Sequence, residues 1–321
     1  MNLLNYVGHK SQLYRVEEHR LIGGKGDGLR LLEIDNGQGL CMTLSIDKCL
    51  DISRLSAHGM NLGYFAVSGY THPSYYEAEG GKFLKSAPFG FLTTCGLDNV
   101  GVSCTDQGEV LPVHGSISNT PAECLRYYDA QEQIIIEAEI SDEVLFGRKL
   151  RLFRTYEISL HSNTFTLKDR IVNTGDQLEA VCLLYHLNMG YPLLDEDSII
   201  HVSSAEVKPR DSHAATGLGQ WKEAQVPTVG YREQCFYHAC TEVGEASIEQ
   251  PKRNTKVLIQ WDPQVLDCFT QWKMMGVRDY VMGLECGNCY PDGRAAMRES
   301  GILKELAAGD ELLYEVKITI S

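Results

Sequence analysis

The sequence predicts an all-β protein: a large β-sandwich in a single domain, with few short helices. Two observations point to this fold class. Apolar and polar residues alternate with a period of two over many short runs, as in residues 149–158. Turn-forming residues rich in Gly, Asn and Asp separate these runs, and no stretch sustains the 3.6-residue period of an amphipathic helix.

The first predicted strands form a hairpin, in which residues 29–34 and 40–46 flank the turn 35–39. The further predicted strands, in chain order, are residues 134–140, 149–158, 164–172, 178–187, 198–202, 234–239, 256–261, 279–284 and 311–320. The Gly-rich residues 23–28 superficially resemble a phosphate-binding loop. No strand-loop-helix unit surrounds them, so we expect a tight loop and no nucleotide site.

The chain organisation indicates one domain spanning residues 1–321. No stretch has the composition of a linker, and no internal repeat occurs. Large β-sandwiches routinely exceed roughly 200 residues as single units. We expect residues 1–29 to form an N-terminal strand and loop segment that packs on the sandwich.

The charge balance excludes two classes of partner. The 321 residues include 43 acidic and 29 basic side chains, a net charge of −14. A nucleic-acid binder needs a basic face, and docking on an anionic membrane needs basic clusters, so we expect neither partner. No apolar run approaches the ~18–20 residues that span a bilayer, and the N-terminus lacks the pattern of a signal peptide. We therefore expect a cytoplasmic protein.

The eleven cysteines are scattered, and their number is odd. This favours buried, reduced thiols over a disulfide framework. The one CxxC motif, Cys286 to Cys289, has no second pair or histidines at zinc-ligand spacing nearby. Turn residues follow it, where a redox motif would open a helix. We expect no cofactor and no metal.

Three side chains stand where acid–base chemistry could occur. His114 precedes Gly115, whose missing side chain allows a close approach of backbone or ligand. His186 lies near the end of an apolar strand, where its side chain can project into a cleft and exchange a proton near neutral pH. Glu285 ends another apolar strand, and an apolar setting raises the pKa of a carboxylate. A histidine bonded within the core and a carboxylate exposed at a strand end are the structural alternatives.

Other side chains suit sugar binding. Arg54 follows a strand and could bind a sugar or anionic oxygen, or pair with Asp51 on the surface. Trp272 and Lys273 combine an aromatic face with a long hydrogen-bond donor, although tryptophan is also common in cores. Asp98 faces a ligand or forms an Asx turn with Asn99.

Taken in order, Arg54, His114-Gly115, Tyr185-His186-Leu187-Asn188 and Gly283-Leu284-Glu285 resemble the galactose mutarotase-like superfamily, the aldose 1-epimerases. The resemblance is greatest to a divergent bacterial branch long described as a domain of unknown function. It covers most of the chain from about residue 30 onward. It implies a β-supersandwich with an open cleft on one sheet.

The resemblance also implies roles for individual residues. Glu285 corresponds to the general base, His186 to the general acid, and His114 to a second histidine that binds and polarises the sugar. Arg54 corresponds to the substrate-binding arginine, with Ser53 where a glycine is usual. Asn188, Asp98, Lys273 and Trp272 complete the expected substrate-binding set. The family's substrate-binding aspartate has no clear counterpart; Asp211 is the nearest guess.

These residue types fit mutarotation without help from the family, because opening a hemiacetal requires one group that takes a proton and one that gives it. The expected ligand is a small carbohydrate, and uncharged sugars are favoured because few cationic side chains converge. Two other functions stay open: a non-catalytic sugar-binding or sensing protein, and a metal-assisted isomerase or lyase in which His114, His186 and Glu285 hold the ion. A homodimer also stays open.

Overall fold

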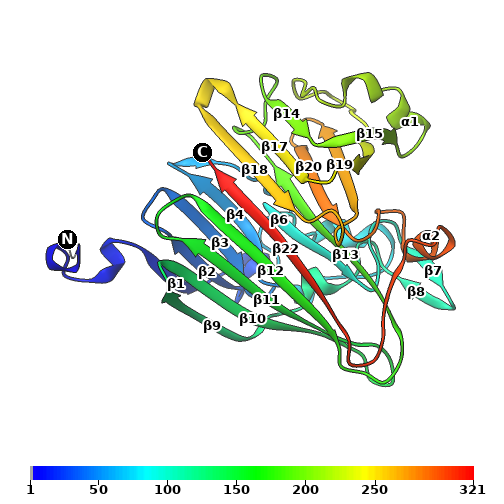
Figure 1. The fold of residues 1–321 in the computed structure, drawn as a ribbon, viewed down its shortest axis with the longest axis horizontal. Coiled ribbons are helices and arrows are strands. Elements are labelled where there is room, and N and C mark those ends of the chain that lie inside the picture. Colours follow the sequence, from blue (N-terminus) through cyan, green and yellow to red (C-terminus); the bar gives the residue numbers. More distant parts are fainter. Residues whose placement is uncertain (1–2) are drawn as a thin grey trace.

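The computed structural model describes residues 3–321 (Figure 1). Residues 1 and 2, the start of the predicted N-terminal segment 1–29, lie outside the described residues. Antiparallel strands form three large sheets and one two-stranded sheet. In Figure 1 the eight-stranded sheet runs across the front, and the other two large sheets pack behind it.

The five-stranded sheet has the order β1 (Arg15–Arg20), β2 (Arg30–Asp35), β3 (Leu40–Ser45), β4 (Asp51–Ala57) and β5 (Met60–Asn61). The eight-stranded sheet has the order β14 (Ile199–Val202), β17 (Gly244–Gln250), β18 (Thr255–Trp261), β22 (Glu311–Ile320), β12 (Thr164–Asn173), β11 (Lys149–Ser159), β10 (Gln133–Glu143) and β9 (Glu123–Ala130).

The seven-stranded sheet has the order β15 (Ser204–Pro209), β16 (Gln234–Cys240), β19 (Cys268–Met275), β20 (Tyr280–Gly287), β13 (Glu179–Met189) and β21 (Lys304–Leu306), and β6 (Leu92–Leu97) also pairs with β13. The small sheet joins β7 (Cys104–Asp106) to β8 (Glu109–Leu111).

The helices are short. The α-helices are α1 (Ser212–Ala215) and α2 (Arg294–Glu299). The 3₁₀-helices are η1 (Leu3–Tyr6), η2 (Lys10–Gln12), η3 (Gly24–Gly26), η4 (Pro73–Tyr75), η5 (Gly80–Lys85), η6 (Ile117–Asn119), η7 (Leu218–Gln220) and η8 (Pro251–Arg253).

The predicted all-β sandwich with few short helices is confirmed. Strands β10, β11 and β12 bury every second residue, as their alternating sequences predict. Ile136 of β10 and Leu152 of β11 belong to the same hydrophobic cluster as Leu32 of β2 and Leu44 of β3. The eight-stranded sheet therefore shares one core with the sheet behind it, as in a sandwich.

A buried network of ion pairs and hydrogen bonds connects strands of the three large sheets. Arg154 of β11 is fully buried and donates to Asp169 of β12 at 2.9 and 2.7 Å, and to Asp51 of β4 at 2.7 Å. It also donates to Thr94 of β6 at 2.8 Å, while the hydroxyl of Tyr185 on β13 donates to Asp169 at 2.8 Å. Charge-assisted hydrogen bonds thereby connect strands of the three large sheets.

The expected tight loop forms, and most cysteines are buried free thiols as expected, although Cys41 and Cys124 are exposed. The Gly23–Gly28 stretch forms a tight loop around η3, closed by a hydrogen bond from Gly28 N to Leu21 O at 2.9 Å. Cys286 and Cys289 are buried in the core, and Asn288 between them accepts from Leu183 N at 2.7 Å and donates to Val181 O at 3.1 Å. The CxxC turn thus fastens β20 to β13.

Within residues 3–321, no helix has the length and apolar character needed to cross a membrane.

Candidate active site

A cavity of about 820 Å³ opens on one face of the seven-stranded sheet. Strands β13, β19 and β20 form its floor, and the segments 64–89 and 101–114 contribute walls. The charged and imidazole side chains in its lining are His114, His186, Arg210, Glu233, Asp279 and Glu285. Its volume falls within the range of small-molecule sites.

His186 and Glu285 meet at the floor because their strands are antiparallel neighbours. Tyr185 of β13 pairs with Cys286 of β20, and the same antiparallel register brings His186, the residue after Tyr185, beside Glu285, the residue before Cys286. His186 Nε2 lies 3.3 Å from Glu285 Oε1. Thr270 of β19 is the cross-strand partner of Glu285 on the other side and also lines the cavity. Adjacent strands therefore present one row of polar side chains to the cavity.

Burial changes the protonation of this pair. Only 4% of His186 and 1% of Glu285 is exposed. Loss of solvation lowers the pKa of His186 to about 3 and raises that of Glu285 well above its usual value. Neither His186 Nδ1 nor Glu285 Oε1 has a hydrogen-bond partner among the described residues. Two ionisable side chains of the cavity lining thus keep unused hydrogen-bonding capacity.

Gly283 gives the Glu285 side chain its room. A Cβ built on Gly283 would lie 2.1 Å from Glu285 Oε1, and 3.0 Å from Trp272 Cβ.

We expect Gly283→Ala to displace the Glu285 carboxylate and to lower any activity of this site by about 100-fold, since a displacement of about 1 Å has such effects. Gly219→Ala is the control because a Cβ there meets nothing within 4 Å. Equal rates for the two variants would show that the carboxylate position is unimportant.

His114 lies on the loop after β8, with a left-handed φ of 58°. Its backbone N–H donates to Gly101 O at 2.8 Å, and Gly101 N–H donates to His114 Nδ1 at 3.3 Å. Burial lowers its pKa to about 4. A neutral ring that accepts at Nδ1 carries its proton on Nε2, so His114 can donate a hydrogen bond to a ligand.

Gly115 makes the close approach expected from the sequence. It has a φ of 73°, and a Cβ there would lie 2.1 Å from Gly96 O. Only glycine therefore fits between the His114 loop and β6. The centroid of the His114 ring lies 5.6 Å from that of His186, so this packing brings the two histidines together.

Two aromatic rings flank His186. The ring centroids of Phe89 and Trp272 lie 5.0 Å and 5.3 Å from that of His186. Both rings line the cavity. Aromatic faces beside hydrogen-bonding groups suit a ligand with an apolar face and polar edges.

A carboxylate anchors one of these rings. Trp272 Nε1 donates to Glu233 Oε2 at 2.7 Å. Glu233 Oε1 accepts from the Arg210 guanidinium at 3.3 Å. The indole is therefore held in place by a residue that itself lines the cavity.

Of the residues predicted from the sequence, the structure brings His114, His186, Glu285 and Trp272 together in the cavity lining. The expectation that Lys273 faces the ligand is wrong, because Lys273 follows Trp272 on β19 and points to the opposite face. It is buried and donates to Gln220 O at 3.0 Å.

Three further predicted residues do not line the cavity. Asn188 is buried and donates to Gly90 O at 2.9 Å and to His186 O at 3.0 Å, so it supports the strand that carries His186. Arg54 lies on β4 in the five-stranded sheet, with its guanidinium 4.2 Å from the centroid of the Phe65 ring. Neither residue is among those that line the cavity, so the structure does not support their assignment to the ligand site.

Asp98 also lies behind the cavity lining. One of its oxygens is 3.7 Å from Arg148, and burial raises its pKa to about 6. A Cβ on Gly115 would lie 2.5 Å from Asp98 Oδ1. Asp98 therefore packs against the back of the His114 loop, and its assignment as a ligand-binding residue is corrected.

The sequence interpretation missed Arg210, Glu233 and Phe89, which lie in connections or at the edges of strands. One signal pointed to Glu233: it lies between His186 and Glu285 in the chain, the interval in which the resemblance implies a carboxylate. Asp211, the nearest guess for that role, instead caps α1 by accepting from Ala214 N at 2.8 Å.

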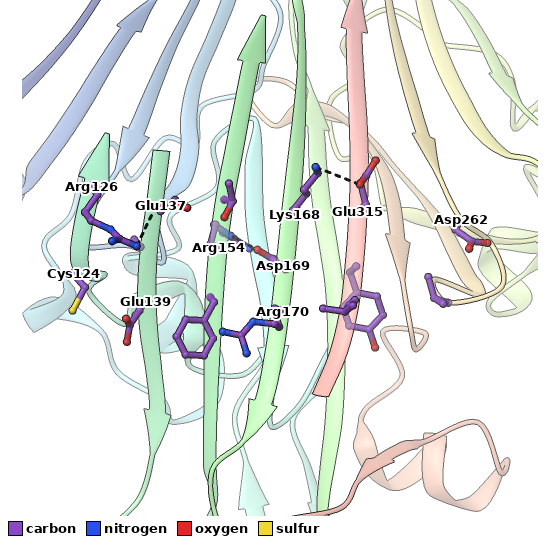
Figure 2. Close-up of a pocket in the computed structure, with 16 residues that line it drawn as sticks. Cys124, Arg126, Glu137, Glu139, Arg154, Lys168, Asp169, Arg170, Asp262 and Glu315 are labelled. Atoms are coloured by element: carbon purple, nitrogen blue, oxygen red, sulfur yellow. Dashed lines mark hydrogen bonds and ion pairs between the residues drawn. The ribbon is translucent and has the colours of Figure 1, made fainter. Parts of the chain in front are cut away.

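A second hollow of about 610 Å³ lies on the outer face of the eight-stranded sheet (Figure 2). Its charged side chains pair with one another: Arg126 lies 3.1 Å from Glu137, and Lys168 lies 4.0 Å from Glu315. No buried polar atom of its described lining residues lacks a partner. The described lining of this hollow therefore has no buried, unpartnered histidine or carboxylate like those of the first cavity.

No group of three or more His, Cys, Asp or Glu side chains placed to hold a metal ion occurs in residues 3–321.

Comparison with solved structures identifies the class of fold. A candidate aldose 1-epimerase of Klebsiella pneumoniae superposes with a TM-score of 0.89 at 24% identity, over 97% of this chain and 86% of that one. A galactose mutarotase-like protein of Clostridium acetobutylicum gives 0.69 at 14% identity, over 97% and 99%. Galactose 1-epimerase of Lactobacillus acidophilus gives 0.63 at 13% identity, over 96% and 99%. The fold is that of the galactose mutarotase-like proteins.

At the level of sequence, residues 26–320 match the family described as a domain of unknown function, DUF4432. The chain belongs to this family. Comparison with curated proteins finds no match.

Proposed function

We propose that this protein is a mutarotase, which interconverts the two anomers of an uncharged reducing sugar by acid–base ring opening. The observation that carries the proposal is the contact between His186 and Glu285. Both side chains are buried and line the cavity, His186 Nε2 lies 3.3 Å from Glu285 Oε1, and neither Glu285 Oε1 nor His186 Nδ1 has a hydrogen-bond partner among the described residues. The fold of known mutarotases agrees with this chemistry but does not by itself establish it.

The surroundings of the pair suit a sugar ring. Phe89 and Trp272 offer apolar surface to the C–H face of the ring. His114 offers an Nε2–H donor to a ring or hydroxyl oxygen. Thr270 Oγ1, a buried hydroxyl without a partner among the described residues, lies in the same row.

The proposed reaction moves two protons and consumes none. In ring opening, Glu285 takes the proton from the anomeric hydroxyl while His186 gives a proton to the ring oxygen. The bond between the anomeric carbon and the ring oxygen breaks, which leaves a carbonyl group and a hydroxyl. After the carbonyl rotates, the hydroxyl attacks its other face, and both proton transfers run in reverse.

The cycle requires one proton on the pair, which moves from His186 to Glu285 by way of the sugar. In the free protein, burial disfavours the charged forms of both groups. The single proton therefore resides on Glu285 in the empty cavity, and an incoming sugar must redistribute it. Because the two groups are in contact, their titration belongs to the pair as a unit.

This proton count predicts the pH dependence of the rate. The pKa of His186 is lowered to about 3 and that of Glu285 is raised, so the pair holds one proton between these two values. Activity should be constant at pH values above the lowered pKa of His186 and fall as the pH rises through the raised pKa of Glu285, where the shared proton leaves. Initial rates, corrected for the uncatalysed reaction at each pH, test this. An activity that rises into alkali would contradict the shared proton.

The proposal is tested with exchange NMR on a panel of free aldoses and ketoses, combined with melting curves on the same panel. Faster exchange between the anomers of at least one sugar supports a mutarotase. A sugar that raises the melting temperature without faster exchange indicates a non-catalytic carbohydrate-binding protein. The barrier to be lowered is modest, since about 1.4 kcal/mol corresponds to a tenfold rate increase.

A further inference from the structure

The cavity contains one cationic side chain, and carboxylates already neutralise it. Arg210 is the one lysine or arginine among the described residues that line the cavity. Its guanidinium lies 3.3 Å from Glu233 Oε1 and 3.5 Å from Asp211 Oδ2. Only 24% of its side chain is exposed, so it has little freedom to turn to another partner.

Glu233 is held from two sides at the cavity wall. Its Oε1 accepts from Arg210 and its Oε2 accepts from Trp272 Nε1 at 2.7 Å. The carboxylate therefore stands between the guanidinium and the indole that flanks His186. A charge fixed in this position acts on anything that enters the cavity.

The other side chains in the lining add no positive charge. Asp279 lies at the cavity wall within 3.4 Å of the Tyr64 hydroxyl, and Glu285, whose charged form burial disfavours, lies at the floor. Three carboxyl groups thus accompany one guanidinium. An anionic ligand finds no free cation here and meets like charge, which reduces its affinity.

From this arrangement we propose that Glu233 determines the charge specificity of the site. By engaging Arg210, it prevents the guanidinium from binding a phosphate or carboxylate group on the sugar, so that uncharged sugars are selected. Arginine binds such groups through its planar fork of donors, and a carboxylate already in contact competes directly for them. This inference rests on the proposed sugar chemistry and adds to it the residue that sets the class of sugar.

The test is Glu233→Gln. Glutamine keeps the size of the side chain and an oxygen that accepts from the Trp272 indole, but it removes the charge that occupies Arg210. The probes are an uncharged aldose that the wild-type protein binds or turns over, its 6-phosphate and its uronic acid. We expect the preference for the uncharged sugar, as a ratio of kcat/KM values, to fall by about fivefold or more, a modest change because half of the Glu233 side chain is exposed to solvent.

Two further variants separate this role from a structural one. In Glu233→Gln combined with Arg210→Gln, the gain for anionic sugars should disappear, because no guanidinium remains to bind them. Asp211→Asn is the matched control: it also removes a carboxylate beside Arg210, but outside the cavity lining, and asparagine still caps α1. It should leave the preference within about twofold of that of the wild-type protein.

The pH profile provides an independent readout. The charge of Glu233 contributes to the raised pKa of Glu285, where burial is the larger cause. Removing that charge should shift the alkaline limb of the rate profile to lower pH. Glutamine keeps the size of the side chain and the acceptor for the Trp272 indole, so with an unchanged melting temperature a shift of this limb reports the lost charge.

The outcomes separate the two proposals. If the wild-type protein turns over uncharged sugars and Glu233→Gln has the same preference for them, Glu233 does not determine charge specificity. The mutarotase proposal is then unaffected. If no sugar is turned over, the preference is measured as ligand-induced stabilisation with the same probes. If neither protein is stabilised by any of the probes, both proposals fail.

Discussion

Replacing Glu285 with glutamine is expected to reduce catalysed anomer exchange by about 100- to 10,000-fold, the usual contribution of a general acid–base group. Glutamine has nearly the shape of the glutamic acid side chain, so the packing against Gly283 and Thr270 is retained. It can neither give nor take the proton that the cycle requires. The measurement is the rate of exchange between anomers at equilibrium, with the melting temperature as a check on folding.

A matched control is Glu157→Gln, the same change on the outer face of β11. Glu157 pairs with Lys168 at 2.7 Å on the eight-stranded sheet, and it does not line the candidate active site. We expect it to retain the wild-type exchange rate. Full activity of Glu285→Gln would show that Glu285 has no role in the proposed mechanism, irrespective of the rate measured for Glu157→Gln.

Replacing Arg154 with methionine should lower the free energy of unfolding by about 3–5 kcal/mol. The substitution leaves Asp169 and Asp51 buried without their cationic partner. Burial already raises the pKa of Asp51 to about 6 even though Arg154 opposes this shift. Without Arg154 the penalty for a charged Asp51 increases, so the loss of stability should be larger at neutral pH than at mildly acidic pH, where Asp51 becomes protonated.

Urea unfolding of Arg154→Met and Lys168→Met measures this difference. Lys168 also forms an ion pair, at 2.7 Å with Glu157, but 42% of its side chain is exposed. Such exposed pairs contribute about 0–1 kcal/mol, so Lys168→Met should be nearly neutral. Equal stability of the two variants would show that the buried network does not hold the sheets together.

Alternation explains why much of the fold was predictable from the sequence. The predicted strand at residues 149–158 became β11, and that at 164–172 became β12, because each has one buried and one solvent-facing side. Strand β6 escaped prediction because all six of its residues are buried, so its sequence does not alternate. Strand β1 was predicted only as an unplaced strand within residues 1–29, for the opposite reason: it exposes nearly every residue, so no alternation marks its bounds.

The candidate site was predictable where its residues lie on strands. His186 and Glu285 stood out as polar groups in apolar runs, a contrast that is visible without knowing which strands pair. Lys273 was misassigned because the sequence does not reveal which of two neighbours, Trp272 or Lys273, faces the cavity. Glu233 was missed because its position is defined by its contacts with Arg210 and Trp272, which depend on tertiary structure.

The central claim is that the His186–Glu285 pair catalyses ring opening. Two-dimensional exchange NMR at equilibrium tests it most directly, with the panel sugar that gives the largest thermal stabilisation. We predict cross-peaks between the two anomers that grow in proportion to protein concentration and fall to the uncatalysed level with Glu285→Gln. A sugar that binds, with exchange that stays at the uncatalysed rate at every protein concentration, would contradict the account.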